Sequence, residues 1–297
     1  MYPAPFKYHR ANSVTQAIEL LSGIGEGARV LAGGQSLLPL LKLRFDEPTD
    51  LVDVARIPGL AGIDTHAGTA SLGALATHRQ IALSALAAAV PIVSDCAHGI
   101  ADNQVRSRGT IGGSVASGDP SCDWPALLHT LDAQIQCRGP NGERTLDING
   151  FVQDLYQTGL QPGELITGVR FAVPGAGSGG AYCAFKRCAP AFPTASVGVQ
   201  LKLAAGQVVS ARIAMGSSGP TPIRSHEAEA ELTGGSLSKE RVDRAADAAV
   251  ASASPFDDQR GPAAFKRQLI ATLTRRAIGI AQRRASGETV KNSHEYY

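Results

Sequence analysis

Two glycine pairs are the part of this 297-residue chain best suited to binding an anion, because each follows an apolar run and precedes small polar residues. The first lies in Val30-Leu31-Ala32-Gly33-Gly34-Gln35-Ser36 and the second in Gly109-Thr110-Ile111-Gly112-Gly113-Ser114. Glycine admits backbone conformations closed to other residues, so consecutive N–H groups can converge on one ligand. Hydroxyl donors lie at Ser36, Thr110, Ser114 and Ser117.

Neither pair is followed by a lysine for a terminal phosphate. This pattern favours an internal pyrophosphate, as in a dinucleotide such as FAD, held by backbone dipoles and hydroxyl groups. Two tight turns with a purely structural role are the alternative reading of the same residues.

Other nucleotide and hydrolase motifs are excluded by their context. Gly175-x-Gly177-x-x-Gly180 has the spacing of a dinucleotide fingerprint, but Pro174 precedes it and strand-like residues follow it, whereas the fingerprint must open a helix. We therefore expect residues 174–180 to be a linker. The chain has no Gly-Lys dipeptide for a P-loop and no GxSxG elbow, and His226-Glu227 lacks the second histidine of a zinc protease.

Composition predicts a globular protein without its own metal site. The five cysteines form no CxxC pair, so we expect buried free thiols in a reducing compartment and no iron–sulfur cluster or zinc in this chain. Aromatic residues make up 5% of the chain, too few to favour nucleic-acid binding. No apolar stretch is long enough for a membrane span and the first residues lack a signal sequence, so the expected location is the cytoplasm.

The first sixty residues read as alternating helix and strand. Ser13 and Gln16 form a capping box that opens a helix, which Gly23 is expected to close. Ala28–Leu31 reads as a strand that runs into the first glycine pair, and residues 50–54 read as a second strand. Ile57-Pro58-Gly59 indicates a subdomain boundary near residue 58.

The middle of the chain continues this pattern around the second glycine pair. We expect a strand over 70–75, a helix capped by Thr77 and a helix from Pro91 to about Gly99. A helix should begin at Asp123-Trp124-Pro125 and run through Leu131, with proline in its first turn. Strands at 134–138 and 143–146 flank a Pro140-Asn141-Gly142 turn, which is a hairpin signal.

The last third of the chain reads as a three-stranded sheet backed by helices. Strands are expected at 181–188, 195–203 and 208–215. The final helix places its apolar residues Phe265, Leu269, Leu273, Ala277 and Ile280 on one stripe. Its basic residues Lys266, Arg267, Arg275, Arg276, Arg283 and Arg284 form either a solvated face or a docking surface for an acidic partner.

Four motifs in order resemble the signatures of one family. They are Ala32-Gly33-Gly34-Gln35-Ser36-Leu37-Leu38-Pro39, Gly73-Ala74-Leu75-Ala76-Thr77-His78, Gln104-Val105-Arg106-Ser107-Arg108-Gly109-Thr110-Ile111-Gly112-Gly113 and Asp119-Pro120-x-x-Asp123. The chain resembles the FAD-binding medium subunit of molybdenum hydroxylases, the group that includes the carbon monoxide dehydrogenase medium subunit and the flavin domain of xanthine dehydrogenase. The resemblance runs from Phe6 to about Arg284.

The resemblance implies an α+β fold. It comprises an FAD-binding domain of the vanillyl-alcohol-oxidase (PCMH) type in two α/β subdomains, and a C-terminal domain with a three-stranded antiparallel sheet and helices. With the boundaries read above, the FAD-binding domain covers residues 1–176, with subdomains of about 1–58 and 59–176. The C-terminal α+β domain covers residues 177–297.

The same resemblance assigns cofactor-binding residues but no catalytic residue and no metal ligand. The pyrophosphate turns would comprise Ala32, Gly33, Gly34, Gln35, Ser36, Leu37, Thr110, Gly112, Gly113 and Ser114. The ribityl and ribose region would be lined by Ser117, Asp119 and Asp123, with Ile100, Ile166 and Lys186 also near FAD. The alternatives are plain core for the two isoleucines, plain surface for Lys186, a helix cap for Asp123 and a packed or capping role for His78.

The sequence departs from the family pattern at two positions. Ser114 stands where asparagine is common, and Gly118 stands where alanine is common. A serine keeps one hydroxyl donor but loses the reach of the amide. The contact made by residue 114 is therefore the part of the expected site that is open.

The function implied by the resemblance is electron transfer in a complex. FAD in this chain would take electrons from two [2Fe–2S] clusters of a small subunit and pass them to NAD, a quinone, a cytochrome or oxygen. A large subunit with a molybdopterin cofactor would oxidise the substrate, which this sequence does not identify. The assembly would be a dimer of heterotrimers, and the alternatives are a self-sufficient flavin-dependent oxidase of the same fold and a non-catalytic structural subunit.

Overall fold

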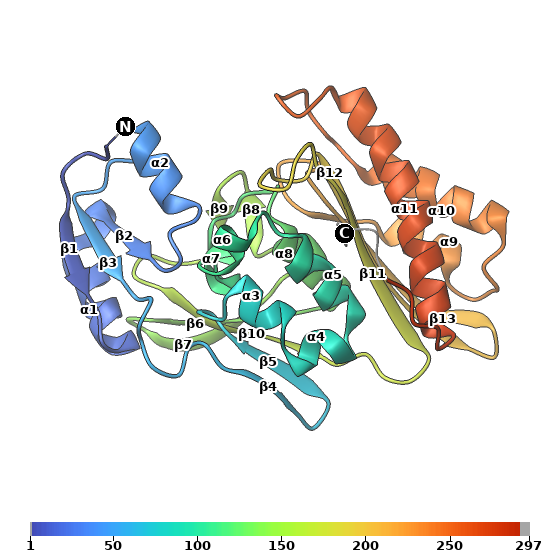
Figure 1. Cartoon of the computed structure of the whole chain (residues 1–297), viewed down its shortest axis with the longest axis horizontal. Coiled ribbons are helices and arrows are strands. Elements are labelled where there is room, and N and C mark those ends of the chain that lie inside the picture. The colour runs from blue at the N-terminus through green and yellow to red at the C-terminus, as the bar shows by residue number, and fades with distance from the viewer. Residues whose placement is uncertain (1, 292–297) are drawn as a thin grey trace.

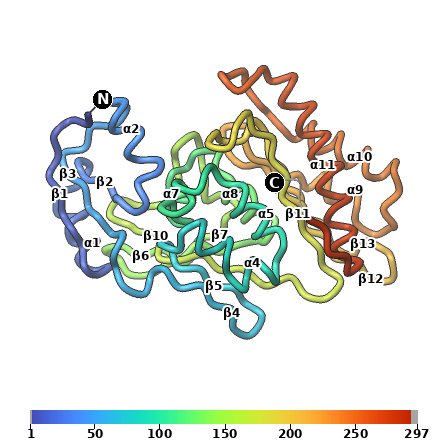
Figure 2. The backbone as a smooth tube through the Cα atoms, in the orientation of Figure 1, coloured from blue at the N-terminus to red at the C-terminus, as the bar shows by residue number. Residues whose placement is uncertain are grey.

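The computed structural model describes residues 2–291 and is α+β, as expected (Figure 1). Three sheets of three or more strands follow one another along the described residues, each with its own helices, and the backbone trace shows them side by side from the blue to the red end (Figure 2). We refer to them as the N-terminal, central and C-terminal sheets. No helix among the described residues has the length and apolar character needed to cross a membrane.

The N-terminal sheet is parallel and has the order β1-β3-β2, with β1 at Lys7–Arg10, β3 at Asp50–Asp53 and β2 at Ala28–Leu31. Helix α1, Val14–Ile24, begins at the predicted cap, where Ser13 Oγ accepts a hydrogen bond from the Gln16 N–H at 3.1 Å. It does not end at Gly23, because Gly25 with φ 76° forms the C-cap. A short 3₁₀ turn, Gly25–Gly27, then leads into β2.

A second helix in this region was not predicted. Helix α2, Leu37–Leu43, begins directly after the first glycine pair and contains Pro39 in its first turn. Proline is tolerated there because the first N–H groups of a helix have no partner within the helix.

The central sheet is antiparallel and has the order β4-β5-β10-β6-β7. Its strands are β4 Ile63–His66, β5 Thr69–Gly73, β10 Leu165–Ala172, β6 Gln134–Gly139 and β7 Gly142–Asp147. The predicted hairpin is confirmed, since Gly139 pairs with Gly142 across the turn. A small pair of strands, β8 Val152–Asp154 and β9 Gln157–Thr158, lies beside it.

Six short helices pack on the central sheet and close its core. They are α3 His78–Ala82, α4 Ala85–Ala89, α5 Pro91–Gly99, α6 Asn103–Arg106, α7 Ile111–Ala116 and α8 Asp123–Thr130. Thr77 caps α3 as predicted, because its hydroxyl accepts from the Gln80 N–H and Gln80 Oε1 accepts from the Thr77 N–H. The core is centred on Trp124, which is 1% exposed.

The C-terminal sheet contains the three predicted strands and a two-residue fourth strand at one edge. These are β11 Ser178–Phe185, β12 Ala195–Ala204, β13 Gln207–Gly216 and β14 Ile223–Arg224, all antiparallel. Helices α9 His226–Leu232, α10 Lys239–Ser252 and α11 Ala263–Ala285 follow. Figure 1 shows α11 on one side of this sheet and α5 and α8 of the central region on the other.

The expected linker is shorter than predicted, because Gly179 and Gly180 belong to β11. A Cβ at Gly179 would lie 2.2 Å from the carbonyl oxygen of Ala281 in α11. A Cβ at Gly180 would lie 3.0 Å from Ile92 Cβ in α5. Successive residues of a strand face opposite sides, so these glycines allow close packing on both faces of the sheet.

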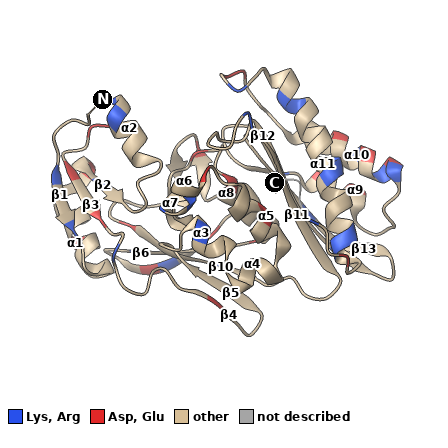
Figure 3. Ribbon diagram, in the orientation of Figure 1, with Lys and Arg blue, Asp and Glu red and all other residues tan. Residues whose placement is uncertain are grey.

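The buried stripe of helix α11 only partly matches the predicted one, which it shares at Leu273 and Ala277. The side chains facing the sheet are Ile270, Leu273, Thr274, Ala277, Ile278 and Ala281, whereas Phe265 is 37% exposed. Ion pairs also account for four of its six basic residues: Lys266 with Asp258, Arg275 with Asp243, Arg283 with Glu288 and Arg284 with Asp95. Most of the blue residues of α11 in Figure 3 are therefore paired with carboxylates of the same chain.

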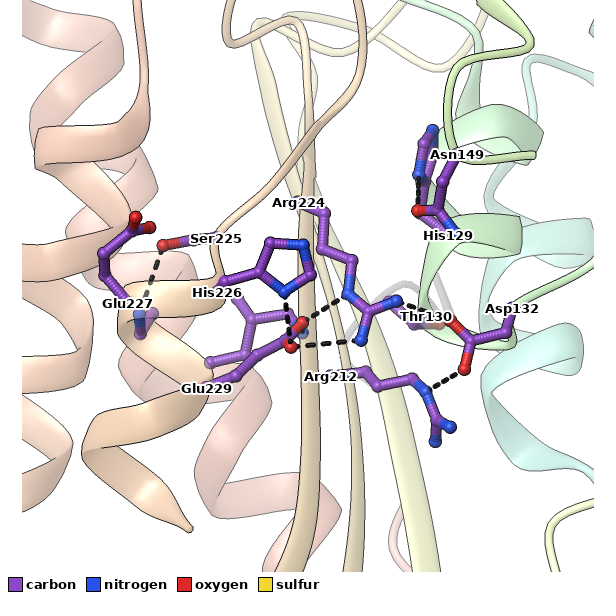
Figure 4. A network of polar contacts seen from close by, with 12 residues as sticks. His129, Thr130, Asp132, Asn149, Arg212, Arg224, Ser225, His226, Glu227 and Glu229 are labelled. Atoms are coloured by element: carbon purple, nitrogen blue, oxygen red, sulfur yellow. Dashed lines mark hydrogen bonds and ion pairs between the residues drawn. The ribbon is translucent and has the colours of Figure 1, made fainter. Parts of the chain in front are cut away.

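Besides the Lys186–Asp123 ion pair, charged residues join the C-terminal sheet to the central region at two further places. Arg284 forms a buried ion pair with Asp95 of α5 at 2.6 Å, and it also donates to the carbonyl of Gly180. A second set lies at Asp132, which forms ion pairs with both Arg212 and Arg224, and Arg224 also pairs with Glu229 at 2.7 Å (Figure 4). The first contact holds β11 against α5, and the second holds β13 against the residues that follow α8.

We expect Arg284→Ala to lower the free energy of unfolding by about 3–5 kcal/mol, because it leaves the buried Asp95 carboxylate without its cation. Urea denaturation measures this loss. Arg283→Ala is the matched control, since the Arg283–Glu288 pair is exposed and should contribute less than about 1 kcal/mol. Equal losses in the two variants would contradict this account.

Candidate functional site

The first glycine pair forms an open turn with unpaired backbone N–H groups. Gly34 has φ 74°, and the turn connects the end of β2 to the start of α2. Among the described residues, no acceptor pairs with the N–H groups of Gly33, Gly34, Gln35 or Ser36. The turn is partly exposed, so four consecutive amides are available to a ligand oxygen.

The second glycine pair is not a turn but the start of helix α7. Thr110 is the N-cap, and its Oγ1 accepts from the Gly113 N–H at 3.1 Å. Gly112 is needed for packing, because a Cβ there would lie 2.5 Å from the Ala74 side chain. Both glycines have ordinary helical backbones, so the predicted turn geometry was wrong at this position while the small residues are required all the same.

The two glycine motifs are in direct backbone contact. A Cβ at Gly33 would lie 2.1 Å from the carbonyl oxygen of Arg108 and 2.9 Å from the Gly109 Cα. The motif Gly73–His78 is also in contact with them, since the His78 N–H donates to the Gly109 carbonyl at 3.0 Å. Segments more than seventy residues apart therefore meet at one place, as a ligand held from two sides requires.

His78 is buried in this junction. Its Nδ1 accepts from the indole N–H of Trp124 at 2.9 Å, and its side chain contacts Gly109. Burial, followed by the charges of Arg106 and Lys186, lowers the pKa of His78 to about 3. The ring is therefore neutral in the native protein near pH 7.

A buried polar cluster lies at the start of α8. Asp123 Oδ2 accepts from the Lys186 ammonium at 3.2 Å, and Asp123 Oδ1 accepts from the Tyr182 hydroxyl at 3.1 Å. Lys186 also donates to the carbonyl of Gly99 at 2.7 Å, next to Ile100. Lys186 is thus not a surface residue, and Asp123 does not cap its helix with its side chain.

Tyr182 is the member of this cluster that the sequence reasoning missed. Its side chain is 1% exposed, and burial beside Asp123 raises the pKa of its phenol well above the usual value. Alternation along β11 places Tyr182 and Lys186 on the same face, which is the signal that could have identified it.

The segment between α7 and α8 is held by its own side chains. Ser117 Oγ donates to the carbonyl of Ser114 at 2.8 Å, and Asp119 Oδ1 accepts from the Ser121 N–H at 2.8 Å. Gly118 has φ 60°, and a Cβ there would lie 2.9 Å from the carbonyl carbon of Tyr156. This close approach is the physical reason for glycine at this position.

The remaining expected site residues divide between surface and core. Gln35 and Ser36 are exposed in the first turn, and Leu37 is the first residue of α2. Ile100 and Ile166 both lie in the core of the central region, at 9% and 8% exposure. Among the described residues there is no cluster of metal-ligating side chains, and four of the five cysteines are buried.

Comparisons with known proteins match both parts of the chain to described domain families. Residues 4–174 match a family model described as the FAD binding domain in molybdopterin dehydrogenase, and residues 180–281 match the CO dehydrogenase flavoprotein C-terminal domain. The chain is 40% identical to the carbon monoxide dehydrogenase medium chain of Afipia carboxidovorans, over 96% of this chain and 99% of the relative. It is 37% identical to the 6-hydroxypseudooxynicotine dehydrogenase complex subunit alpha of Paenarthrobacter nicotinovorans, over 96% and 97%.

A solved structure shares the whole fold. It is the carbon monoxide dehydrogenase from Hydrogenophaga pseudoflava which lacks the Mo-pyranopterin moiety of the molybdenum cofactor. The TM-score is 0.94 at 41% identity, and the match covers 96% of this chain and 99% of that chain.

We expect Gly118→Ala to lower the free energy of unfolding by about 1–3 kcal/mol, because alanine is strained at φ 60° and would press against Tyr156. Chemical denaturation measures the change. In Gly175→Ala the new methyl group enters open space, so that control should change stability by less than about 0.5 kcal/mol. A Gly118→Ala protein as stable as the control would refute the strain argument.

His78 should also make stability depend on pH. Its pKa is about 3 in the native protein against 6.5 for the ordinary group, so the unfolded chain binds a proton that the folded chain does not between these values. The free energy of unfolding should therefore fall as pH drops below 6.5, by up to about 1.4 kcal/mol per pH unit from this group. Denaturation at pH 7, 6 and 5 should show a shallower slope in His78→Asn, and identical slopes would contradict the prediction.

Proposed function

The chain belongs to the FAD-binding medium-subunit family of molybdopterin dehydrogenases, and we propose that it holds FAD at its joined glycine motifs as the electron-transfer subunit of a larger complex. The observation that carries this proposal is the contact of Gly33 with the backbone of Arg108 and Gly109. That contact brings the first turn, with its unpaired amides, next to the backbone segment that leads into α7.

The residues at this junction fit a pyrophosphate. The N–H groups of residues 33–36 can donate to its oxygens. Neither motif contains a lysine, the residue that would be expected to bind a terminal phosphate. The Thr110 hydroxyl accepts from Gly113, so its own proton is available to a ligand. Ser114, four residues after Thr110, carries a second hydroxyl group in α7.

The Asp123–Lys186 pair supplies the other part of the proposed site. Asp123 has both oxygens in hydrogen bonds, and Lys186 spans from α8 to the end of α5, so neither side chain can rotate without losing a buried contact. Lys186 follows β11, which means that the C-terminal region contributes to a site built mainly by the central region. We propose that Ile100, Ser117, Asp119 and Ile166 complete the contacts with the cofactor.

FAD, when bound, supplies a carrier of one or two electrons, which suits transfer from the [2Fe–2S] clusters of a small subunit to an acceptor such as NAD, a quinone, a cytochrome or oxygen. The protein holds and orients the cofactor and needs no general base for this task. We propose that the substrate is oxidised by a large molybdopterin-containing subunit, in a cytoplasmic dimer of heterotrimers. One relative is named as a medium chain and another as a subunit of a complex, and these names support a role inside an assembly.

Spectroscopic titration of the purified full chain with FAD tests this proposal. We expect a flavin absorption spectrum that remains with the protein after gel filtration and no oxidation of small molecules by the chain alone. A chain that retains no flavin, even with its partner subunits, would refute the proposal. Turnover of a small-molecule substrate by the chain alone would favour the alternative of a self-sufficient oxidase.

We expect Gly33→Ala to weaken FAD binding at least about tenfold, because a Cβ 2.1 Å from the Arg108 carbonyl forces the two motifs apart. Titration of the apoprotein with FAD measures the dissociation constant. Gly175→Ala adds the same methyl group where no atom lies within 4 Å, and it should bind FAD like the unaltered chain. Normal FAD affinity in Gly33→Ala would show that the contact between the motifs is not needed for binding.

A further inference from the structure

His78 has one ring nitrogen whose protonation state is determined by its neighbour. The indole N–H of Trp124 can only donate, so the Nδ1 that it contacts at 2.9 Å must be an acceptor. The low pKa of the ring excludes the doubly protonated form near pH 7. The single proton of the imidazole is therefore on Nε2.

The Nε2 edge of the ring faces the second glycine motif. A Cβ on Gly109 would lie 2.7 Å from Nε2 and 2.9 Å from the neighbouring Cδ2, so glycine at 109 is what allows this approach. The backbone N–H of His78 holds the Gly109 carbonyl at the same point, which restricts movement between the two residues. The ring is 5% exposed and cannot turn away without losing Trp124.

The Nε2–H group has no acceptor among the described residues, although the side chain is almost completely buried. A donor without a partner on a mostly buried side chain normally receives its acceptor from a ligand or water. Here the donor lies where the first and second glycine motifs meet.

We propose that His78 is a cofactor-binding residue that donates a hydrogen bond from Nε2 to an oxygen atom of FAD at the second glycine motif. This inference rests on the proposed function. A neutral donor suits the site, because it binds the oxygen without adding a second buried charge beside Lys186. Trp124 is then a positioning residue, since its N–H keeps the His78 proton on the nitrogen that faces the cofactor.

Two substitutions distinguish the role of Nδ1 of His78 from the role of Nε2. His78→Asn can keep an acceptor near Nδ1 for Trp124 but does not reach the position of Nε2. His78→Gln reaches that position with an amide N–H but offers Trp124 no acceptor at Nδ1. We expect FAD to bind His78→Asn roughly tenfold or more weakly than it binds the unaltered chain, and to bind His78→Gln within about threefold of it.

The thermal stability of the two apoproteins should follow the opposite order, because the Trp124 hydrogen bond is lost in His78→Gln. In the full chain labelled with ¹⁵N-histidine, the Nε2–H resonance of His78 should also move when FAD is added. That shift is a readout that a purely structural histidine would not give.

The inference is overturned if His78→Asn binds FAD as tightly as the unaltered chain, or if both variants lose affinity equally in step with their stability. An unchanged Nε2–H resonance on FAD binding would overturn it as well. These outcomes differ from a failure of the proposed function, in which the unaltered chain itself would not bind FAD.

Discussion

The structure depends on the close approach of backbone segments that only glycine permits. Gly33 lies against the Arg108 carbonyl, Gly112 lies against Ala74, and Gly109 lies against the ring of His78. Any side chain at these positions would require the neighbouring backbone or ring to move. The site is thus defined by close packing first, and the unpaired amides of the first turn become useful because that packing aims them at one place.

The C-terminal sheet extends this constraint to the whole chain. Gly179 and Gly180 bring β11 against α11 on one face and α5 on the other. Arg284 then ties this strand to Asp95, and Lys186 reaches Asp123 from its far end. A region that follows the cofactor-binding domain in the sequence therefore packs against the candidate site, and these two ion pairs are among the contacts that hold it in place.

Several charged residues of this protein attach one element to another. Lys266 is 2% exposed and pairs with Asp258, although a helical pattern places it among solvated residues. The network from Arg212 through Asp132 and Arg224 to Glu229 links the two larger regions in the same way (Figure 4). Ion pairs within the molecule thus account for many of the basic residues in the last third of the chain.

The sequence alone determined the features that depend on neighbouring residues. The caps at Ser13 and Thr77, the hairpin at Gly139 and Gly142 and the family motifs all depend on residues close together in the chain, whose hydrogen bonds and backbone preferences are local. The tertiary structure alone decided that Gly112 and Gly113 begin a helix, that α11 buries Ile270 and Ile278, and that Tyr182 joins the Asp123–Lys186 pair. These features depend on contacts between segments that are far apart in the chain. No short stretch of the sequence determines which distant surface it will pack against.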